Sequence, residues 1–141
     1  MKRVAFILIQ ALWGFPQTLL GLVLYGVNRK KGHVRFHGAL VVPWRHRGSV
    51  SLGPFIFLSN KVNDEFVSNL VVHEYGHCIQ SLIFGPAYLL VIGIPSLIWG
   101  EWPALRKKRE DYELPYFTFF TERFANYLGR KVTGRDAMQG H

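Results

Sequence analysis

Cysteine is almost absent from this 141-residue chain, and a single Cys78 excludes an internal disulfide framework. Acidic residues are also scarce: nine aspartates and glutamates stand against 17 lysines and arginines, which gives a formal net charge of +8. No motif of interleaved aromatic and basic residues accompanies this charge, so nucleic acid is not an expected partner. The length leaves no room for a second independent core, and we predict one domain over residues 1–141.

Charge is missing altogether from residues 4–27, VAFILIQALWGFPQTLLGLVLYGV. An uncharged stretch of this length can cross a hydrocarbon core of about 30 Å. A secretory signal peptide is the alternative, but the apolar run is too long and no small-residue cleavage site closes it. We therefore predict an N-terminal transmembrane helix, which Pro16 beside Gly14 could kink or fold into a hairpin.

Basic clusters at residues 29–31 and 106–109 follow uncharged apolar segments. Anionic headgroups attract such clusters, so the lipid bilayer is an expected partner. Because lysine and arginine concentrate on the cytoplasmic side of membranes, we expect an integral membrane protein with its site at the cytoplasmic face.

Residues 33–60 are rich in β-branched and aromatic residues, with prolines and glycines between the runs. This pattern predicts a short β-hairpin whose turn is the basic segment WRHRGS. The edge of its second strand could accept an extended peptide by strand addition. A hairpin that merely covers a small core fits the pattern equally well.

A helix is expected over residues 64–84, ended by Gly85-Pro86, and it contains the motif H-E-x-x-H from His73 to His77. Histidines four apart on a helix point the same way, so both imidazoles can reach one metal ion. Glu74 between them would be the general base that takes a proton from a metal-activated water. Zinc is the predicted metal, because it lowers the pKa of a bound water to about 7.

Two other residues of this helix, Gly76 and Cys78, bear on the predicted metal site. Gly76 is costly inside a helix and therefore indicates a close neighbour, such as the backbone of a strand or a substrate. Cys78 directly follows His77, which turns its side chain about a hundred degrees away, so it should not bind the metal.

The run HEYGHCIQS resembles the active-site helix of the zincin metallopeptidases, and TERFANYLG resembles the glutamate-bearing helix of their gluzincin branch. The resemblance implies that Glu122 is the third metal ligand and that Asn126 orients His73. In the gluzincin pattern an aspartate stands where this chain has Asn126, which can still accept a hydrogen bond from His73 but adds no charge. Residues 71–98 and 116–129 also resemble small uncharacterised bacterial membrane proteins of metallopeptidase type.

Reasoning from the residues alone leaves other third ligands open: Glu101, Glu110, Asp111, Glu113, His33, His37 and His46. Glu122 has the best local setting, on a helix predicted over residues 116–128 and ended by Gly129. There it shares a face of small and polar residues, which lets two helices approach closely. Two histidines with one glutamate are also a ligand set of catalytic zinc sites. For stabilising an oxyanion the sequence does not choose among Tyr112, Tyr116 and Arg123.

A second apolar segment, residues 81–100, separates the motif from Glu122. If it crossed a bilayer, His77 and Glu122 would lie on opposite sides. We therefore predict that it re-enters or forms a hairpin, turning near Gly93 to Pro95, or that it lies buried against the rest of the chain. A zinc site inside the membrane, as in site-two proteases, would need a carboxylate within a later apolar helix, which this chain lacks.

The predicted fold class is an α+β membrane protein. Its elements are an N-terminal transmembrane helix, a short β-hairpin, the H-E-x-x-H helix, an apolar re-entrant or hairpin segment and a C-terminal glutamate-bearing helix. The predicted function is a membrane-embedded zinc-dependent hydrolase, a peptidase with Glu74 as general base. The alternative is a non-catalytic membrane protein with a structural or degenerate zincin metal site, and a structural zinc would have four protein ligands.

Overall fold

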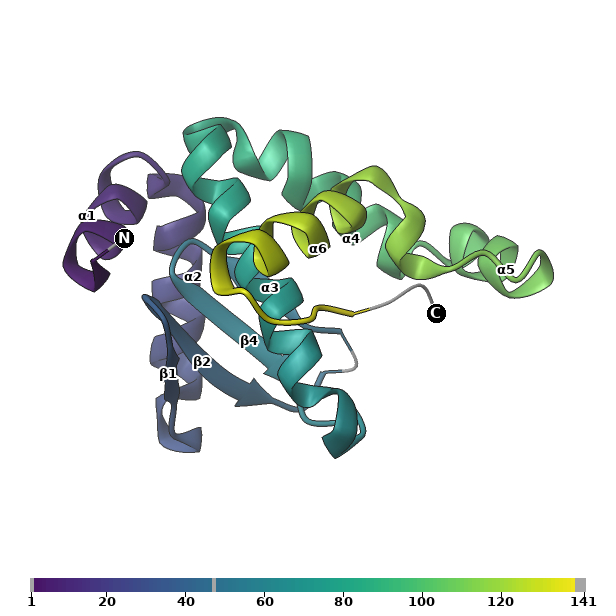
Figure 1. Cartoon of the computed structure of the whole chain (residues 1–141), viewed down its shortest axis with the longest axis horizontal. Helices are drawn as coiled ribbons and strands as arrows, with labels where there is room; N and C mark the ends of the chain where they lie inside the picture. Colours follow the sequence, from purple (N-terminus) through teal and green to yellow (C-terminus); the bar gives the residue numbers. More distant parts are fainter. Residues whose placement is uncertain (1, 47, 139–141) are drawn as a thin grey trace.

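The computed structural model describes residues 2–46 and 48–138 (Figure 1). The strands are β1 (Val34–Phe36), β2 (Ala39–Trp44), β3 (Val50–Leu52) and β4 (Phe55–Ser59). The α-helices are α1 (Arg3–Leu12), α2 (Phe15–Asn28), α3 (Asp64–Phe84), α4 (Ile94–Glu101), α5 (Pro103–Asp111) and α6 (Phe120–Thr133). Short 3-10 turns cover Arg29–Lys31, Gly85–Ala87 and Tyr116–Thr118, and a π-helical turn covers Leu89–Gly93.

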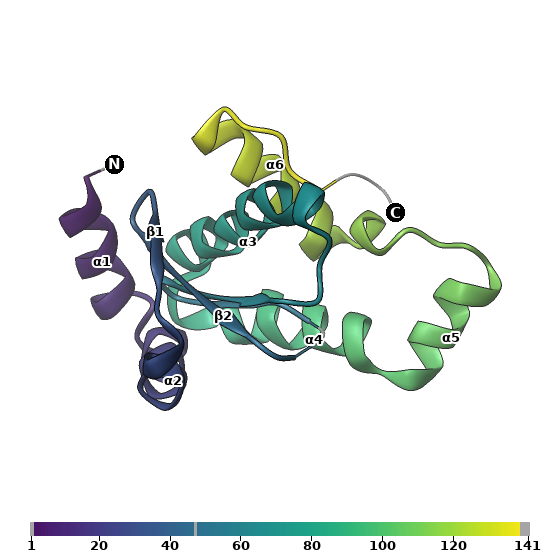
Figure 2. The same ribbon diagram turned by 90° about the horizontal axis from the view of Figure 1, so that it is seen from below.

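The sheet has the strand order β1-β2-β4-β3 and is covered on both faces. Val41 and Ile56 point to one face, where they join buried side chains of α3 in the larger core. Their neighbours Val42 and Phe57 point to the opposite face, where side chains of α2 pack against them. Helix α6 lies across α3, while α5 extends away from the rest of the structure (Figures 1 and 2).

The prediction of one hairpin over residues 33–60 was wrong. Two tight hairpins form instead, β1 with β2 and β3 with β4, and the two inner strands β2 and β4 pair in parallel. Residues with positive φ make the tight turns: His37 (φ 54°) between β1 and β2, and Gly53 (φ 62°) between β3 and β4. The basic segment therefore connects strands that are not neighbours, because β4 lies between β2 and β3.

The prediction of an N-terminal transmembrane helix was also wrong. Among the described residues no helix is both long and apolar enough to span a membrane. Residues 4–27 instead divide between α1 and α2, which meet at an angle of 108°. Pro16 in the first turn of α2 and the buried Gly14 at its N-cap make the break, and Thr18 Oγ1 donates to the carbonyl of Gln10 across it.

The apolar segment 81–100 was predicted to turn near Gly93 to Pro95, and it turns earlier. Helix α3 ends at Phe84, the chain reverses through the 3-10 turn at Gly85–Ala87, and residues 89–101 then run as one helical segment. Gly85 (φ 54°) is required at this reversal, because a Cβ there would collide with the indole of Trp13. This reversal lets the chain return alongside α3.

Helix α6 continues past the predicted end at Gly129. It ends instead at Thr133, with Gly134 in the left-handed conformation as its C-cap. Gly129 is an interior residue of the helix, and it faces the backbone of α3 at Val72.

Candidate metal centre

His73, His77 and Glu122 come together where α3 and α6 cross. One potential ligand atom from each residue lies within 4.8 Å of the others, and all three side chains are buried. Oε2 of Glu122 is 2.9 Å from Nε2 of His73 and 2.9 Å from Nε2 of His77. This buried group could hold a metal ion.

Glycine brings the two helices close enough for this arrangement. A Cβ at Gly76 would collide with the carbonyl oxygen of Ala125 on α6, and a Cβ at Gly129 would collide with the carbonyl oxygen of Val72 on α3. Each helix thus presents a glycine to the backbone of the other. Gly76 does have a close neighbour, but this neighbour is the backbone of helix α6 and not a strand or a substrate.

Amide side chains fix both imidazoles from behind. Nδ1 of His73 lies 2.7 Å from Oδ1 of Asn126, and Nδ1 of His77 lies 2.6 Å from Oε1 of Gln80. Gln80 is itself held by a hydrogen bond from its Nε2 to the carbonyl of Thr121. Because both amide oxygens are acceptors, each Nδ1 carries a proton, so the Nε2 atoms are the ones that face Glu122 and that could bind a metal once they give up their own protons.

In the metal-free group, His77 and Glu122 each stabilise the charged form of the other. Burial favours a neutral imidazole, but the carboxylate of Glu122 outweighs it and raises the pKa of His77 to about 9. Burial likewise favours a neutral carboxyl group, but His77 and the hydrogen bonds from both histidines lower the pKa of Glu122 well below its usual range. Glu122 is therefore an anionic ligand at neutral pH.

Glu74 is buried beside this group and is held by the edge strand β3. Oγ of Ser51 lies 2.8 Å from Oε2 of Glu74 and 2.8 Å from its backbone carbonyl, so the single hydroxyl proton can go to either. Ser51 is in turn held by Tyr88, whose hydroxyl donates to the Ser51 carbonyl at 3.0 Å. The carboxylate of Glu74 is thus oriented from the sheet side.

Tyr116 approaches the group from the other side. Its hydroxyl donates to Oε1 of Glu122 at 3.2 Å. Burial, together with the charges of Glu122 and Glu74, raises the pKa of Tyr116, so it remains a phenol and a hydrogen-bond donor. The guanidinium of Arg109 lies over the Tyr116 ring, 5.4 Å from its centre.

A cavity of about 670 Å³ gives access to the buried group. His73, Glu74, His77 and Glu122 all line it, and Tyr116 lies in the same wall. Apolar side chains from α2, β3 and the 89–101 segment line one part of the remainder, among them Leu20, Leu52, Leu89 and Leu97. Charged side chains line another part: Glu101, Arg106, Arg109 and Glu110. A cavity of this size suits a substrate segment rather than a single water molecule.

The other candidate ligands lie outside the group among the described residues. Glu101 pairs with Arg106 at the surface, and His37 is an exposed turn residue. Glu110, Asp111 and Glu113 are exposed in or just after α5. His33 and His46 are exposed as well.

Of the three residues considered for an oxyanion, Tyr116 reaches the site, whereas Tyr112 and Arg123 are exposed. Cys78 is buried in the core, where burial and the charge of Glu74 raise the pKa of its thiol. It belongs to the packing and not to the metal group.

Sequence reasoning missed Gln80 and Ser51. Gln80 follows His77 by three residues on the same helix, so the helical spacing could have revealed it. Ser51 comes from a strand 23 residues before Glu74, and no local signal marks it.

Removing the amide behind one histidine should weaken metal binding. We expect Asn126→Ala to lower zinc affinity about 10- to 100-fold, because Nδ1 of His73 loses its acceptor. Asn126→Asp keeps an acceptor at this position and should retain at least wild-type affinity. Competition with a chromogenic zinc chelator measures both variants, and wild-type affinity in Asn126→Ala would contradict the assigned role.

Comparisons with protein-family models, with characterised proteins and with solved structures find no match to this chain. The resemblance to zincins is thus neither supported nor refuted by a relative, and the function has to be argued from the geometry of this site.

Proposed function

We propose that this chain is a zinc-dependent hydrolase that cleaves peptides. The observation that carries the proposal is the convergence of His73, His77 and Glu122 with the carboxylate of Glu74 in the wall of one cavity. A structural metal needs no general base beside it, and it needs no cavity open to a substrate.

The donor set fits zinc. Two imidazole nitrogens and one carboxylate oxygen, with no fourth ligand in the group from residues 2–46 and 48–138, are the ligands of catalytic zinc sites. When bound there, zinc would supply an acidified water and polarise the carbonyl of a substrate.

The residues of the chain account for the remaining chemistry. Glu74, oriented by Ser51, would accept a proton from the attacking water and return it to the leaving amine. The phenol of Tyr116 stays protonated and could donate a hydrogen bond to the oxygen on which negative charge develops. Asn126 and Gln80 would hold the two imidazoles in the orientation that the metal requires.

The edge strand supports a peptide as the substrate. Strand β3 is one of the two edge strands of the sheet, and its residues Val50, Ser51 and Leu52 all line the cavity. An extended peptide could add to this edge by main-chain hydrogen bonds, which would bring its backbone past Glu74.

Zinc analysis tests the metal site directly. We expect about one zinc ion per chain in the purified protein and a clear loss in Glu122→Ala, because two imidazoles alone bind zinc weakly. Glu65→Ala, at an exposed position in the first turn of α3, is the matched control and should keep its zinc. Undiminished zinc in Glu122→Ala would contradict the assigned ligand set.

Hydrolysis tests the proposed reaction. A mixture of quenched fluorogenic peptides should be cleaved by the zinc-loaded chain, with cleavage lost on chelation and restored by zinc. A chain that holds zinc tightly, cleaves no peptide and unfolds on chelation would instead have a structural metal site.

A further inference from the structure

Helices α1 and α2 bury polar side chains and expose apolar ones, which is the reverse of the usual pattern for a helix on the surface of a protein core. Their buried residues are Phe6 and Gln10 in α1, and Gln17 and Gly21 in α2. Both glutamines are fully buried, whereas most of the large apolar residues of the two helices are exposed. Amphipathic helices on a protein core normally place the apolar side inward.

The inward glutamines are used to bind the two helices to α3. Nε2 of Gln10 donates to the carbonyl of Cys78 at 2.9 Å, and Ser81 Oγ donates to Oε1 of Gln10 at 2.6 Å. Nε2 of Gln17 reaches both Ser81 Oγ, at 2.7 Å, and the carbonyl of Gly85, at 2.9 Å. These polar contacts hold α1 and α2 in place and leave their apolar side chains outside.

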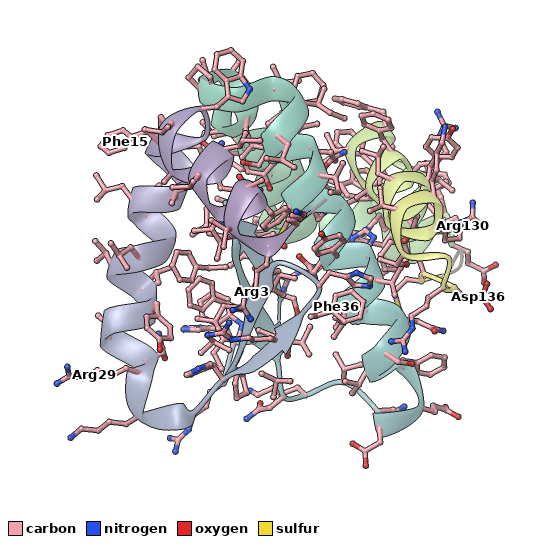
Figure 3. All side chains as sticks on the ribbon, turned by 60° about the vertical axis from the view of Figure 1, so that its left-hand side comes forward. Arg3, Phe15, Arg29, Phe36, Arg130 and Asp136 are labelled. Atoms are coloured by element: carbon pink, nitrogen blue, oxygen red, sulfur yellow. The ribbon has the colours of Figure 1, made fainter. Side chains whose placement is uncertain are left out.

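The outward side chains form what we call the α1–α2 apolar face. Its members are Val4, Ile7, Leu8, Ile9, Leu12, Trp13, Phe15, Leu19, Leu20, Leu22, Val23 and Val27. Leu12 is 82% exposed and Val27 is 77% exposed. Figure 3 shows Phe15 at the corner between the two helices, pointing away from the rest of the molecule, with Arg29 at the far end of α2. An apolar surface of this extent marks a contact with a membrane or with another protein.

The charges around the face select an anionic membrane surface. Lys2 and Arg3 stand at the start of α1, Arg29 and Lys30 follow α2, and no acidic residue precedes Asp64 in the chain. A second copy docked face to face would bring these like charges together. Anionic headgroups, in contrast, attract basic residues at the border of an apolar surface.

A basic hollow beside α1 is a further feature that suits anionic lipid headgroups. It has a volume of about 190 Å³, and Arg3 and Arg35, both exposed, line it together with the apolar side chains of Ile7, Leu40 and Phe55. Two guanidinium groups at an apolar hollow suit a lipid phosphate above the first methylenes of its acyl chains.

We propose that the α1–α2 apolar face seats the protein on the surface of a bilayer that contains anionic lipid. The two helices then lie in the interface, with the basic residues at their ends among the headgroups. The proposal does not depend on the proposed function, because neither the metal ligands nor Glu74 belong to this face.

A labelled cysteine tests where the face goes. Cys78 is buried, so Leu12→Cys can be labelled selectively with an environment-sensitive fluorophore in the folded chain. Val132→Cys, at an exposed apolar position on α6, is the matched control. With vesicles containing phosphatidylglycerol we expect a blue shift at position 12 that acyl-chain-brominated lipid quenches, and no shift at position 132.

Vesicle flotation measures the strength of docking. The double variant Leu12→Glu/Val23→Glu should partition at least about tenfold more weakly into phosphatidylglycerol vesicles than the wild type, because two apolar side chains that would enter the bilayer become charged. Val132→Glu should partition like the wild type, and zwitterionic vesicles should bind the wild type less than anionic ones. Glu122→Ala should also float normally, which separates this test from that of the proposed function.

Three results would overturn the proposal. The first is equal partitioning of wild type and Leu12→Glu/Val23→Glu, or no partitioning at all. The second is binding that salt abolishes without any blue shift at position 12, which means adsorption by charge alone. The third is a blue shift that grows with protein concentration in the absence of vesicles, which means that a second copy covers the face.

Discussion

Glu74→Gln is expected to lower peptide hydrolysis by about 10²- to 10⁴-fold while the bound zinc stays unchanged. Glutamine has the shape of glutamate and can still accept the hydrogen bond from Ser51, which lies 2.8 Å from Oε2. It cannot accept a proton from water, so the variant loses the proton transfer and little else. Initial rates on a fluorogenic peptide, with zinc measured in the same samples, give both quantities.

The control for this variant is Glu65→Gln, on the same helix at an exposed position in its first turn. It removes the same charge from α3 and should keep wild-type rates. Undiminished turnover in Glu74→Gln would rule out Glu74 as the general base. Loss of zinc together with activity would mean that Glu74 helps to hold the metal.

Gly76→Ala is expected to destabilise the fold by about 1–3 kcal/mol and to reduce zinc binding with it. Helix propensity by itself would make this substitution stabilising by about 1 kcal/mol, because alanine favours a helix over glycine. The expected loss of stability therefore comes from packing. The added Cβ would collide with the carbonyl oxygen of Ala125, a backbone atom that cannot rotate away. Helix α6 would have to move from α3, and Glu122 would move with it.

Urea denaturation measures the free energy of unfolding, and Gly26→Ala supplies the control. Gly26 also lies within a helix, α2, but a Cβ there would meet nothing within 4 Å. We expect Gly26→Ala to be neutral or stabilising by up to about 1 kcal/mol. If Gly76→Ala were also neutral or stabilising, the close approach of α3 and α6 would not require a glycine at position 76.

The metal group was accessible to sequence reasoning because its parts are set by local geometry. Helical spacing alone puts His73 and His77 on one side of the predicted helix 64–84, which is the range that α3 has. A face of small residues around Glu122 indicated a close helix contact, whereas Gly76 indicated a close neighbour without identifying it as α6. Ser51 could not be found in this way, since only the folded sheet brings it to Glu74.

The sheet and the N-terminal helices were beyond local patterns. Strands β2 and β4 are buried on both faces, so their apolar runs lack the alternation that separates the two sides of a hairpin. Their parallel pairing depends on contacts between distant residues. In residues 4–27, an uncharged composition does not reveal that Gln10 and Gln17 turn inward to bind α3, and these contacts accompany the bend that divides the stretch.

Because the metal group is divided between α3 and α6, its parts are synthesised at different times. Glu122 follows His73 by 49 residues and His77 by 45. At roughly 5–20 residues per second, a ribosome would need about 2–10 s to add Glu122 after the two histidines. During that interval the nascent chain carries Glu74 and the two imidazoles without the carboxylate of Glu122. The proposed hydrolytic activity would therefore arise only when α6 closes onto α3, after the sheet and the N-terminal helices have been made.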